Sequence, residues 1–336
     1  MVNIKHVAKL AGVSIGTVSN VLTGNRPVSD ELRQRVLSAA EELNYQPNLV
    51  ASSLVTGRTK TIGAVMTDFQ LGLEEFLAGM NSGVREDGFS LLISSLGEEE
   101  DPGKHIQELI GRKVDGIIWV FPETEQNHRW FATQNISLNI PIVFTFGAPI
   151  QNQSSVQVDN FSGGYSATRH LLSVHGCKKI GHISGPRDSF EVKDRKAGWE
   201  KALLEEGIEP EIVCECDWYA EGAEKCTLEM LEKHPDIDGL FAANDLCALV
   251  AIKTLLKINR KVPDDVKVIG FDNVSYLENI SPSLTSVCQD FFGMGYESAK
   301  EIQRRIQYPE ASGNHILLPT QLIIRQSCGC NLDLKG

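Results

Sequence analysis

The sequence predicts a small all-α helix-turn-helix head followed by an α/β core of two doubly wound parallel-sheet subdomains. Three observations lead to this prediction. Apolar residues repeat at helical spacing in residues 1–22, short β-branched strands alternate with helical stretches from Thr61, and the alternation restarts near Asp159. At 336 residues the chain is also longer than one hydrophobic core usually supports.

The first two helices are expected on either side of Gly12, which can turn the chain without a Cβ penalty. Their apolar stripes comprise Ile4, Val7, Ala8, Leu10 and Ala11, and then Ile15, Val18, Val21 and Leu22. Ser14 can cap the second helix, which could then enter the DNA major groove as the recognition helix of a helix-turn-helix motif. A helical hairpin that merely buries its seam is the alternative. The small polar side chains on the second helix favour the DNA interpretation.

A third helix and a linker complete the head. Ser29 is a candidate cap for a helix over residues 31–45, which would close a compact bundle. Residues 48–60 are too short to form a helix alone in water, so we expect them to fold only against a partner. Residues 1–60 carry seven basic and four acidic side chains, a net charge of +3 that leaves −15 for the rest. This distribution favours DNA contact confined to the head, because phosphate neutralisation supplies most non-specific affinity.

The core is predicted from two successive series of strand–helix units. Strands are expected at 61–68, 89–96, 114–121, 141–146, 179–185, 212–217, 239–244 and 267–273, with helices around 74–87, 103–112, 125–138, 162–175, 191–206, 220–233 and 246–258. Such alternation implies parallel sheets with right-handed crossovers. Ligands of these sheets bind beyond the carboxyl ends of the strands.

Polar residues follow several of the predicted strands and are candidates for a ligand cleft. They are Asp68, Trp218, Asn244, Asp245, Asp272, Asn273 and Gln289. Carboxylates and amides hydrogen-bond hydroxyl groups, and an indole ring can cover the apolar face of a sugar, so the set suits a neutral polyhydroxylated ligand. The alternative is that each residue only caps the next helix. For any one of these residues, helix capping is the better explanation. For the seven residues taken together, a ligand cleft is the better explanation.

Other kinds of site find little support in the sequence. A P-loop, an H-E-x-x-H motif and a G-x-S-x-G elbow are all absent, and GMGYES at 293–298 is interpreted as a helix start. The eight cysteines include the pairs Cys214/Cys216 and Cys328/Cys330, and the eight histidines are scattered. We therefore expect reduced structural thiols, no metal site and no cofactor. A polar start without a signal peptide, and the lack of a long apolar run, predict a cytoplasmic protein.

Long motifs occur in a fixed order along the chain. They are IKHVAKLAGVS-x-x-TVSNVL, VSDELRQRVLSAAEELNYQPN, ASSLVTGRTKTIG, the stretch from Gly185 to Trp199, FAAND, GFDN and LIIRQSCGC. In these motifs the whole chain resembles the lactose/galactose-repressor (LacI/GalR) family of bacterial transcription regulators. The resemblance implies a periplasmic-binding-protein-like core and a homodimer that binds a palindromic operator. It implies a head at 1–46, a hinge at 47–60 and a core at 61–336, with one subdomain at about 61–160 and 291–320 and the other at about 161–290 and 321–330.

The resemblance also implies which residues meet DNA. Ile15, Gly16 and Asn20 occupy base-reading positions, Ser14, Thr17 and Ser19 would bind phosphates, and Lys5, Asn48, Ala51 and Leu54 complete the set. Gly16 departs from the family because it offers no side chain, whereas Asn20 can pair with adenine. Leu54 would wedge into the minor groove and kink the duplex once the hinge has folded. The alternative is that Leu54 packs on its own domain.

For the effector site, the resemblance matches Arg195, Trp218, Asn244, Asp272 and Gln289, with Asp68, Asp159 and Glu191 as further candidates. Two departures are Leu73, in a stretch that replaces a stacking aromatic residue, and Phe146, where sugar-binding relatives carry an aspartate. We predict a repressor whose operator affinity is controlled by a small carbohydrate. A purine effector, a transport-type sugar-binding protein and an enzyme with a DNA-binding head are the alternatives.

Overall fold

The computed structural model describes residues 2–23, 27–46, 53, 57–67, 72–97, 100–120, 140–146, 152–275 and 279–330. The chain forms two compact units, Met1–Lys60 and Thr61–Gly336, which we call the head and the core. Four predicted site residues, Asn48, Ala51, Leu54 and Asp68, and the helix expected at 125–138 lie outside the described residues.

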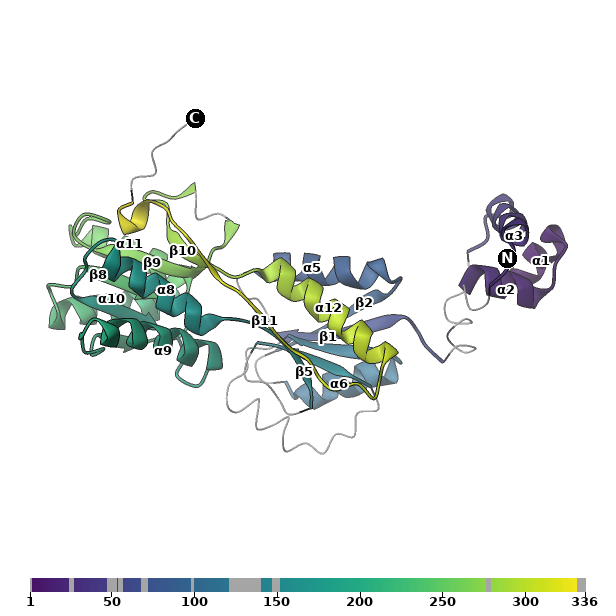
Figure 1. The fold of residues 1–336 in the computed structure, drawn as a ribbon, viewed down its shortest axis with the longest axis horizontal. Coiled ribbons are helices and arrows are strands. Elements are labelled where there is room, and N and C mark those ends of the chain that lie inside the picture. Colours follow the sequence, from purple (N-terminus) through teal and green to yellow (C-terminus); the bar gives the residue numbers. More distant parts are fainter. Residues whose placement is uncertain are drawn as a thin grey trace. The chain divides into compact units, whose positions relative to one another are not determined.

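The head contains the three predicted helices, α1 (Ile4–Ala11), α2 (Ile15–Thr23) and α3 (Asp30–Glu42) (Figure 1). Ser14 and Ser29 accept hydrogen bonds from the first turns of α2 and α3, as expected of helix caps. Gly12 ends α1 in the left-handed conformation, with φ of 64°. Val7, Val18 and Val36, one from each helix, are completely buried in the shared core. The apolar stripes seen in the sequence therefore bury the back of α2 and leave its other face accessible, but Leu10 and Ile15 of these stripes are exposed.

The first sheet of the core has the strand order β11-β5-β4-β3-β1-β2. Its strands are β1 (Thr61–Thr67), β2 (Ser90–Leu96), β3 (Gly116–Val120), β4 (Ile142–Thr145), β5 (Ser154–Val158) and β11 (His315–Leu318), all paired in parallel. Helices α5 (Leu73–Glu86) and α12 (Phe291–Gln307) lie side by side on one face, and α6 (Pro102–Gly111) packs on the other (Figure 1). This is the doubly wound arrangement that the sequence predicts.

The second sheet has the order β12-β10-β9-β8-β6-β7. Its strands are β6 (Ile180–Ser184), β7 (Val213–Glu215), β8 (Gly239–Ala242), β9 (Lys267–Asp272), β10 (Thr285–Cys288) and β12 (Gln321–Ile323). Helices α8 (Asn160–Ser173) and α9 (Phe190–Glu205) cover one face, and α10 (Ala220–Lys233) and α11 (Asp245–Lys257) cover the other. One edge departs from the expected parallel pairing, because β12 runs antiparallel to β10.

The chain crosses between the two sheets three times: from β5 to α8, from β10 to α12, and from β11 to β12. Strands β5, β11 and β12 were not among the predicted strands, and β10 was expected only as the strand that precedes Gln289. Along β11 the side chains alternate between exposed and half-buried, whereas every side chain of the central strand β3 is buried. Among the described helices, none is long and apolar enough to cross a membrane.

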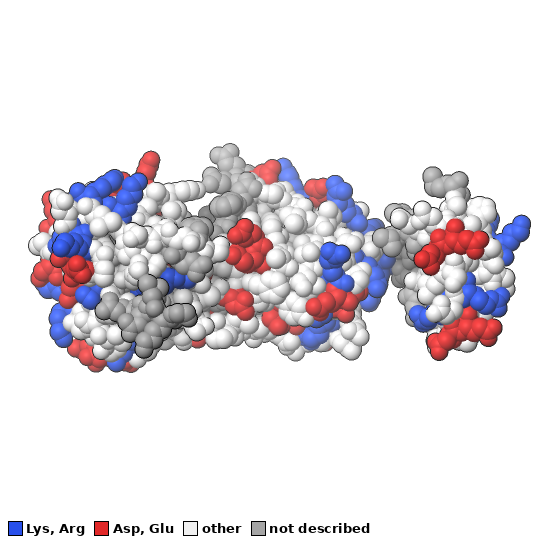
Figure 2. Space-filling model, turned by 90° about the horizontal axis from the view of Figure 1, so that it is seen from above, with Lys and Arg blue, Asp and Glu red and all other residues white. Residues whose placement is uncertain are grey.

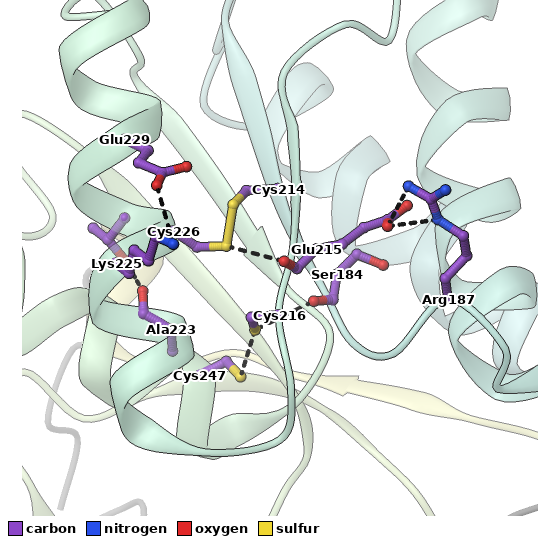
Figure 3. Close-up of a disulfide and its surroundings, with 11 residues drawn as sticks. Ser184, Arg187, Cys214, Glu215, Cys216, Ala223, Lys225, Cys226, Glu229 and Cys247 are labelled. Atoms are coloured by element: carbon purple, nitrogen blue, oxygen red, sulfur yellow. Dashed lines mark hydrogen bonds and ion pairs between the residues drawn. A yellow bond between two sulfur atoms is a disulfide. The ribbon is translucent and has the colours of Figure 1, made fainter.

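The expectation that all cysteines are reduced is wrong for one pair. Cys214 in β7 and Cys226 in α10 form a disulfide across 12 residues of sequence, with their Cα atoms 5.6 Å apart (Figure 3). The pair is brought together because α10 packs directly on β6 and β7. Cys216 lies two residues beyond Cys214, and its Sγ atom is 3.9 Å from Sγ of Cys247 (Figure 3).

Candidate functional site

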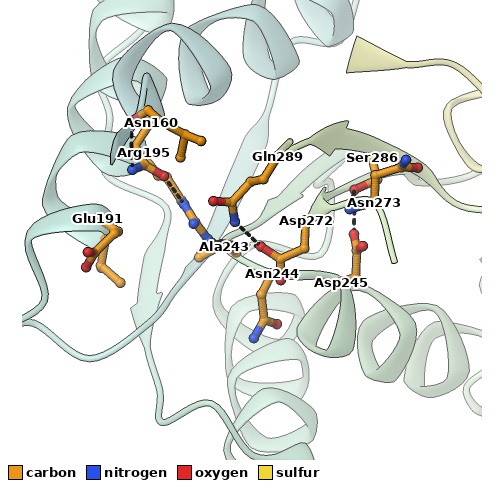
Figure 4. Close-up of polar contacts among 12 residues, drawn as sticks. Asn160, Glu191, Arg195, Ala243, Asn244, Asp245, Asp272, Asn273, Ser286 and Gln289 are labelled. Carbon is orange, nitrogen blue, oxygen red and sulfur yellow. Dashed lines mark hydrogen bonds and ion pairs between the residues drawn. The ribbon is translucent and has the colours of Figure 1, made fainter. Parts of the chain in front are cut away.

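A polar cluster lies at the carboxyl ends of the second sheet (Figure 4). Asp272 is the last residue of β9, Gln289 follows β10, and Asn244 follows β8 as the cap of α11. These residues therefore lie together at the carboxyl ends of the strands, as the sequence predicts. Arg195 reaches the same place from α9 on the covering face.

Arg195 is the cation of this cluster, and its side chain is held from several directions. Its Nε donates to Oδ1 of Asn160 at 2.8 Å, and Nη1 donates to the carbonyl of Ala243. The guanidinium carbon lies 3.8 Å from the centroid of the Phe271 ring, and Nη1 is 3.7 Å from Oδ1 of Asp272. Only 5% of Arg195 is exposed. The guanidinium is therefore pre-positioned and needs no reorganisation to bind a ligand.

Asp272 is the anion of the cluster and is almost fully buried. Its Oδ1 accepts a hydrogen bond of 2.6 Å from Nε2 of Gln289. Burial raises the pKa of Asp272 to about 6, against the opposing attraction of the Arg195 charge. The backbone of Asp272 has φ of 114°, which is strained for a residue with a side chain. Strain and a costly buried charge at one residue are both typical of a binding site.

Gln289 supplies an acceptor that the protein leaves unused. Its Oε1 atom is buried and has no hydrogen-bond partner among the described residues, while Nε2 is occupied by Asp272. A buried acceptor without a donor costs about 1–3 kcal/mol, and a ligand hydroxyl would satisfy it. This is the sharpest indication of a missing hydrogen-bond donor in the cluster.

A cavity of about 340 Å³ is linked to the polar cluster through Asn160, although Arg195, Asp272 and Gln289 do not line it. Asn160, which holds Arg195, is part of its wall, together with the aromatic rings of Phe146, Phe161 and Phe190. Three carboxylates, those of Asp159, Glu191 and Asp194, also line it. Burial and the neighbouring charges of Glu191 and Asp159 raise the pKa of Asp194. The cavity thus combines acidic hydrogen-bond acceptors with apolar rings.

The remaining predicted effector residues lie in different surroundings. The indole of Trp218 packs against Gly185, where an added Cβ would come within 2.4 Å of Cη2. Phe146 has its ring centroid 6.2 Å from that of Phe76 and borders the cavity. Leu73 begins α5 and packs against the apolar cluster of the first sheet, so the structure places it in a core and not in the cavity wall. Oδ1 of Asn244 accepts from the backbone of Cys247 at 2.7 Å, which is the capping role offered as its alternative.

Two residues of the site were not predicted: Asn160, which orients Arg195, and Asp194, which lines the cavity. Asp245, a predicted cleft candidate, accepts hydrogen bonds from Ser286 Oγ at 2.6 Å and Val274 N at 3.1 Å, and it braces the loop that follows Asp272. The pairing of Asn160 with Arg195 depends on how α8 packs on α9, which no pattern in the sequence indicates.

The candidate nucleic-acid interface is the start of α2. Ser14, Ile15 and Gly16 are exposed there, and Ile15 keeps 45% of its surface accessible. Thr17, Ser19 and Asn20 are half-buried, and Lys5 on α1 is exposed. An exposed apolar residue at the start of such a helix suits contact with a thymine methyl group.

Gly16 is not required by the fold of the head. A Cβ at this position would make only an ordinary contact of 3.6 Å with Oγ of Ser14. A glycine inside a helix costs roughly 1 kcal/mol relative to alanine. A glycine at this position would allow the start of α2 to approach DNA closely.

The basic character of the head is not spread over its whole surface. On the face seen in Figure 2, acidic and basic side chains lie side by side on the head and on the core. The acidic residues of α3 are Asp30 and Glu31 in its first turn and Glu41 and Glu42 at its end. Negatively charged side chains at the start of a helix interact favourably with the helix dipole. This interaction explains Asp30 and Glu31 without reference to DNA.

The expectation that histidines and cysteines share no ligand spacing is wrong. His170 and His175 lie with Cys328 and Cys330 in one group, whose ligand atoms are all within 4.8 Å of one another. The spacing of four residues between the two histidines was visible in the sequence. Their partners come from the end of the chain, so only the fold reveals the complete set.

Comparisons with known proteins agree with the two parts of the chain. A family model described as bacterial regulatory proteins, lacI family, matches residues 3–48, and one described as periplasmic binding protein-like domain matches residues 168–328. The ribose operon repressor of Halalkalibacterium halodurans is 34% identical over 334 residues, which cover 97% of each chain.

Two solved structures are similar over almost the whole chain. The transcriptional regulator CelR in complex with cellobiose is 30% identical, with a TM-score of 0.72, and the match covers 97% of this chain and 100% of that one. The lac repressor dimer bound to operator and the anti-inducer ONPF is 27% identical, with a TM-score of 0.82, and the match covers 97% and 99%. Head and core therefore occur together in characterised proteins.

Proposed function

Since the chain belongs to the LacI family of bacterial regulatory proteins and is a ligand-responsive transcriptional repressor, we propose that its effector is a small neutral carbohydrate. The effector would bind to the cluster of Arg195, Asp272 and Gln289 and extend into the adjoining cavity. The observation that carries this proposal is the unused Oε1 acceptor of Gln289 beside a buried ion pair. Sugar hydroxyls act as donors and acceptors at once, so they can satisfy all three side chains.

The charges of the site support a neutral ligand. Arg195 is already balanced by Asp272, and the carboxylates of Asp159, Glu191 and Asp194 line the cavity. A phosphorylated sugar or a nucleotide would bring additional negative charge toward these carboxylates. The aromatic rings of Phe146, Phe161 and Phe190 offer apolar surfaces to the faces of a sugar ring.

The exposed start of α2 supports the proposed contact with operator DNA. A homodimer with one recognition helix per half-site would read a palindromic operator, as in the operator-bound lac repressor dimer. We propose that the protein works in the cytoplasm and binds its effector without turning it over. Effector binding changes operator affinity only through its different affinities for the DNA-bound and free states.

A thermal-shift screen over neutral mono- and disaccharides, sugar phosphates and purines tests the ligand class. At a hundredfold excess over its Kd, a ligand that binds the folded state stabilises it by about 2.7 kcal/mol, so the correct compound raises Tm by several degrees. We expect a neutral sugar to do so and to be recovered unchanged. A shift produced only by purines or by sugar phosphates, or turnover of the sugar, would contradict the proposal.

The substitution Asp272→Ala locates the site. With the identified sugar, the variant should lose the effector response of operator binding in a gel-shift assay, while binding without effector is retained. Asp264→Ala is the matched control, because Asp264 is an exposed aspartate of the same unit. Equal effector sensitivity of the two variants would remove Asp272 from the site.

A further inference from the structure

The four residues His170, His175, Cys328 and Cys330, which we call the His2Cys2 cluster, lie apart from the candidate effector site. His170 is in the last turn of α8, and His175 lies two residues beyond the end of that helix. Cys328 ends the short 3-10 helix η2 (Gln326–Cys328), and Cys330 follows Gly329. The cluster therefore joins two segments that are more than 150 residues apart in the sequence.

The local backbone turns both sulfur atoms toward the histidines. Gly329 has φ of 91°, a conformation that residues with a side chain rarely adopt, and it separates the two cysteines. The preceding segment is fixed on the second sheet, because Ser327 Oγ donates to the carbonyl of Val268 and accepts from the backbone of Thr285. The cysteines thus enter the cluster from a rigid part of the chain.

Three of the distances between donor atoms are close to those of a tetrahedral metal site, and all four donor atoms lie within 4.8 Å of one another. The two Nε2 atoms are 3.2 Å apart, and Sγ of Cys330 is 3.6 Å from Nε2 of His170 and 3.4 Å from Nε2 of His175. Ligands on a tetrahedron with Zn–N of about 2.0–2.1 Å and Zn–S of about 2.3 Å are separated by roughly 3.3–3.8 Å. Two thiolates and two imidazoles in this geometry are typical of zinc.

Burial is also suitable for a structural ion. Cys328 is completely buried and His170 is 9% exposed, whereas His175 and Cys330 are half-buried and leave a route from solvent. Hydrogen bonding gives only a partial account of the group. The Cys328 thiol donates to the carbonyl of Arg325 at 3.4 Å, but a thiol is a weak partner and a neutral imidazole has only one donor and one acceptor. A cation at the centre would satisfy all four donor atoms together.

We propose that the His2Cys2 cluster binds one zinc ion, which fastens residues 326–330 to the end of α8. Two thiolates compensate the two positive charges of the ion, so the loaded site is neutral. Because four protein ligands close the coordination shell, the site is structural and has no open position for catalysis. The other end of α8 carries Asn160, which positions Arg195, so the ion anchors the helix that borders the effector cavity.

Metal analysis of the full chain tests the proposal. The protein is produced with zinc in the medium and purified under reducing conditions without chelator, and bound metals are measured by inductively coupled plasma mass spectrometry. We expect one equivalent of zinc per chain. Replacement by Co2+ should give the intense d–d bands of tetrahedral cobalt and a thiolate-to-metal charge-transfer band.

Two ligand variants and two controls locate the ion. We expect bound zinc, and the charge-transfer or d–d intensity of bound cobalt, to be lost in Cys330→Ser and His175→Gln. The controls Cys216→Ser and His234→Gln change half-buried residues outside the cluster and should keep both the zinc and the cobalt spectrum. Chelator should lower the Tm of wild type and controls but leave that of the ligand variants unchanged, and circular dichroism checks that all variants are folded.

Three outcomes would overturn the proposal. The first is wild-type protein without stoichiometric zinc or cobalt binding. The second is equal metal content in Cys330→Ser and Cys216→Ser. The third is a Cys328–Cys330 disulfide in the reduced preparation, detected by thiol counting and mass spectrometry. Each of these measurements is independent of the effector, so failure here leaves the proposed carbohydrate response untouched.

Discussion

At the scale of single residues, Asp272 carries an electrostatic cost within the candidate site. Its carboxyl is buried beside one guanidinium and one amide, and burial raises its pKa from an ordinary 3.8 to about 6. A raised folded-state pKa means that the folded protein binds the proton more tightly than the unfolded chain. The stability that this proton contributes is present below about pH 4 and is lost as the pH rises through 6.

The substitution Asp272→Asn should reveal this cost. Between pH 4 and pH 7 the wild-type free energy of unfolding should fall by about 3 kcal/mol relative to the variant, which has no carboxyl to ionise. Urea denaturation at a series of pH values measures the difference. The exposed Asp264→Asn should run parallel to wild type. A constant difference between wild type and Asp272→Asn would show that this carboxyl ionises as it does in the unfolded chain.

Single residues also show what could be predicted of the site. Asp272 and Gln289 follow strands, so the convergence of strand ends in a parallel sheet, strengthened by family resemblance, was sufficient to propose them together. Asn160 and Asp194 were missed because they lie within or at the start of helices, where a polar residue carries no positional signal. Leu73 was proposed because it lies in a stretch that replaces a stacking aromatic residue of the family, and it packs against the core of the first sheet.

At the scale of elements, the contact between α8 and α9 sets the position of Arg195. A Cβ on Gly164 would lie 2.2 Å from the carbonyl oxygen of Arg195, and one on Gly198 would lie 2.2 Å from that of Phe161. The two backbones approach closely because both positions lack a side chain. Asn160 and Arg195 can therefore meet across this helix pair at 2.8 Å.

Gly164→Ala should separate these helices and displace Arg195. Overpacking of this kind typically costs about 1–3 kcal/mol of stability, and we expect effector affinity to fall because the pre-positioned guanidinium moves. Calorimetric titration with the effector and a denaturation curve measure the two effects. Gly111→Ala is the control, because a Cβ there would meet nothing within 4 Å. If Gly164→Ala is destabilised but binds the effector with unchanged affinity, the contact between α8 and α9 does not determine the position of Arg195 in the site.

The elements themselves were predictable to an uneven degree. The three helices of the head and the central strands of both sheets have strong apolar periodicity, and the structure contains them. Strands β5, β11 and β12 are short and lie at or next to sheet edges, where one side of the strand is not held by a full apolar run. The Cys214–Cys226 disulfide and the His2Cys2 cluster depend on contacts between elements, which a linear pattern does not encode.

At the scale of the whole molecule, the chain combines a DNA-binding head, Met1–Lys60, with an effector-binding core, Thr61–Gly336. The head offers few base-reading side chains, because Gly16 has none. We therefore expect the spacing of half-sites in a dimer and the deformation of DNA by the hinge to contribute much of the operator specificity. This expectation rests on family resemblance at Leu54, which lies outside the described residues.

Leu54→Ala tests the role of the hinge. A side chain that wedges between base steps acts only where the duplex is kinked, so the variant should lose at least about tenfold in operator affinity, or about 1.4 kcal/mol, with little change on random DNA. Gel shifts at one fixed salt concentration with both DNAs measure the ratio. Leu37→Ala, at an exposed position of α3, is the control. An equal loss on both DNAs would contradict the wedge.

The three crossings between the sheets have a consequence for biosynthesis. The first sheet lacks β11 until residue 318 has been made, and α12, which covers one of its faces, also follows the whole of β6–β10. The head precedes every strand of the core in the sequence, whereas the two sheets are completed only when β11 and β12 have been made. A messenger truncated before residue 315 therefore yields a chain with a head capable of folding but with two unfinished sheets and neither cysteine of the His2Cys2 cluster.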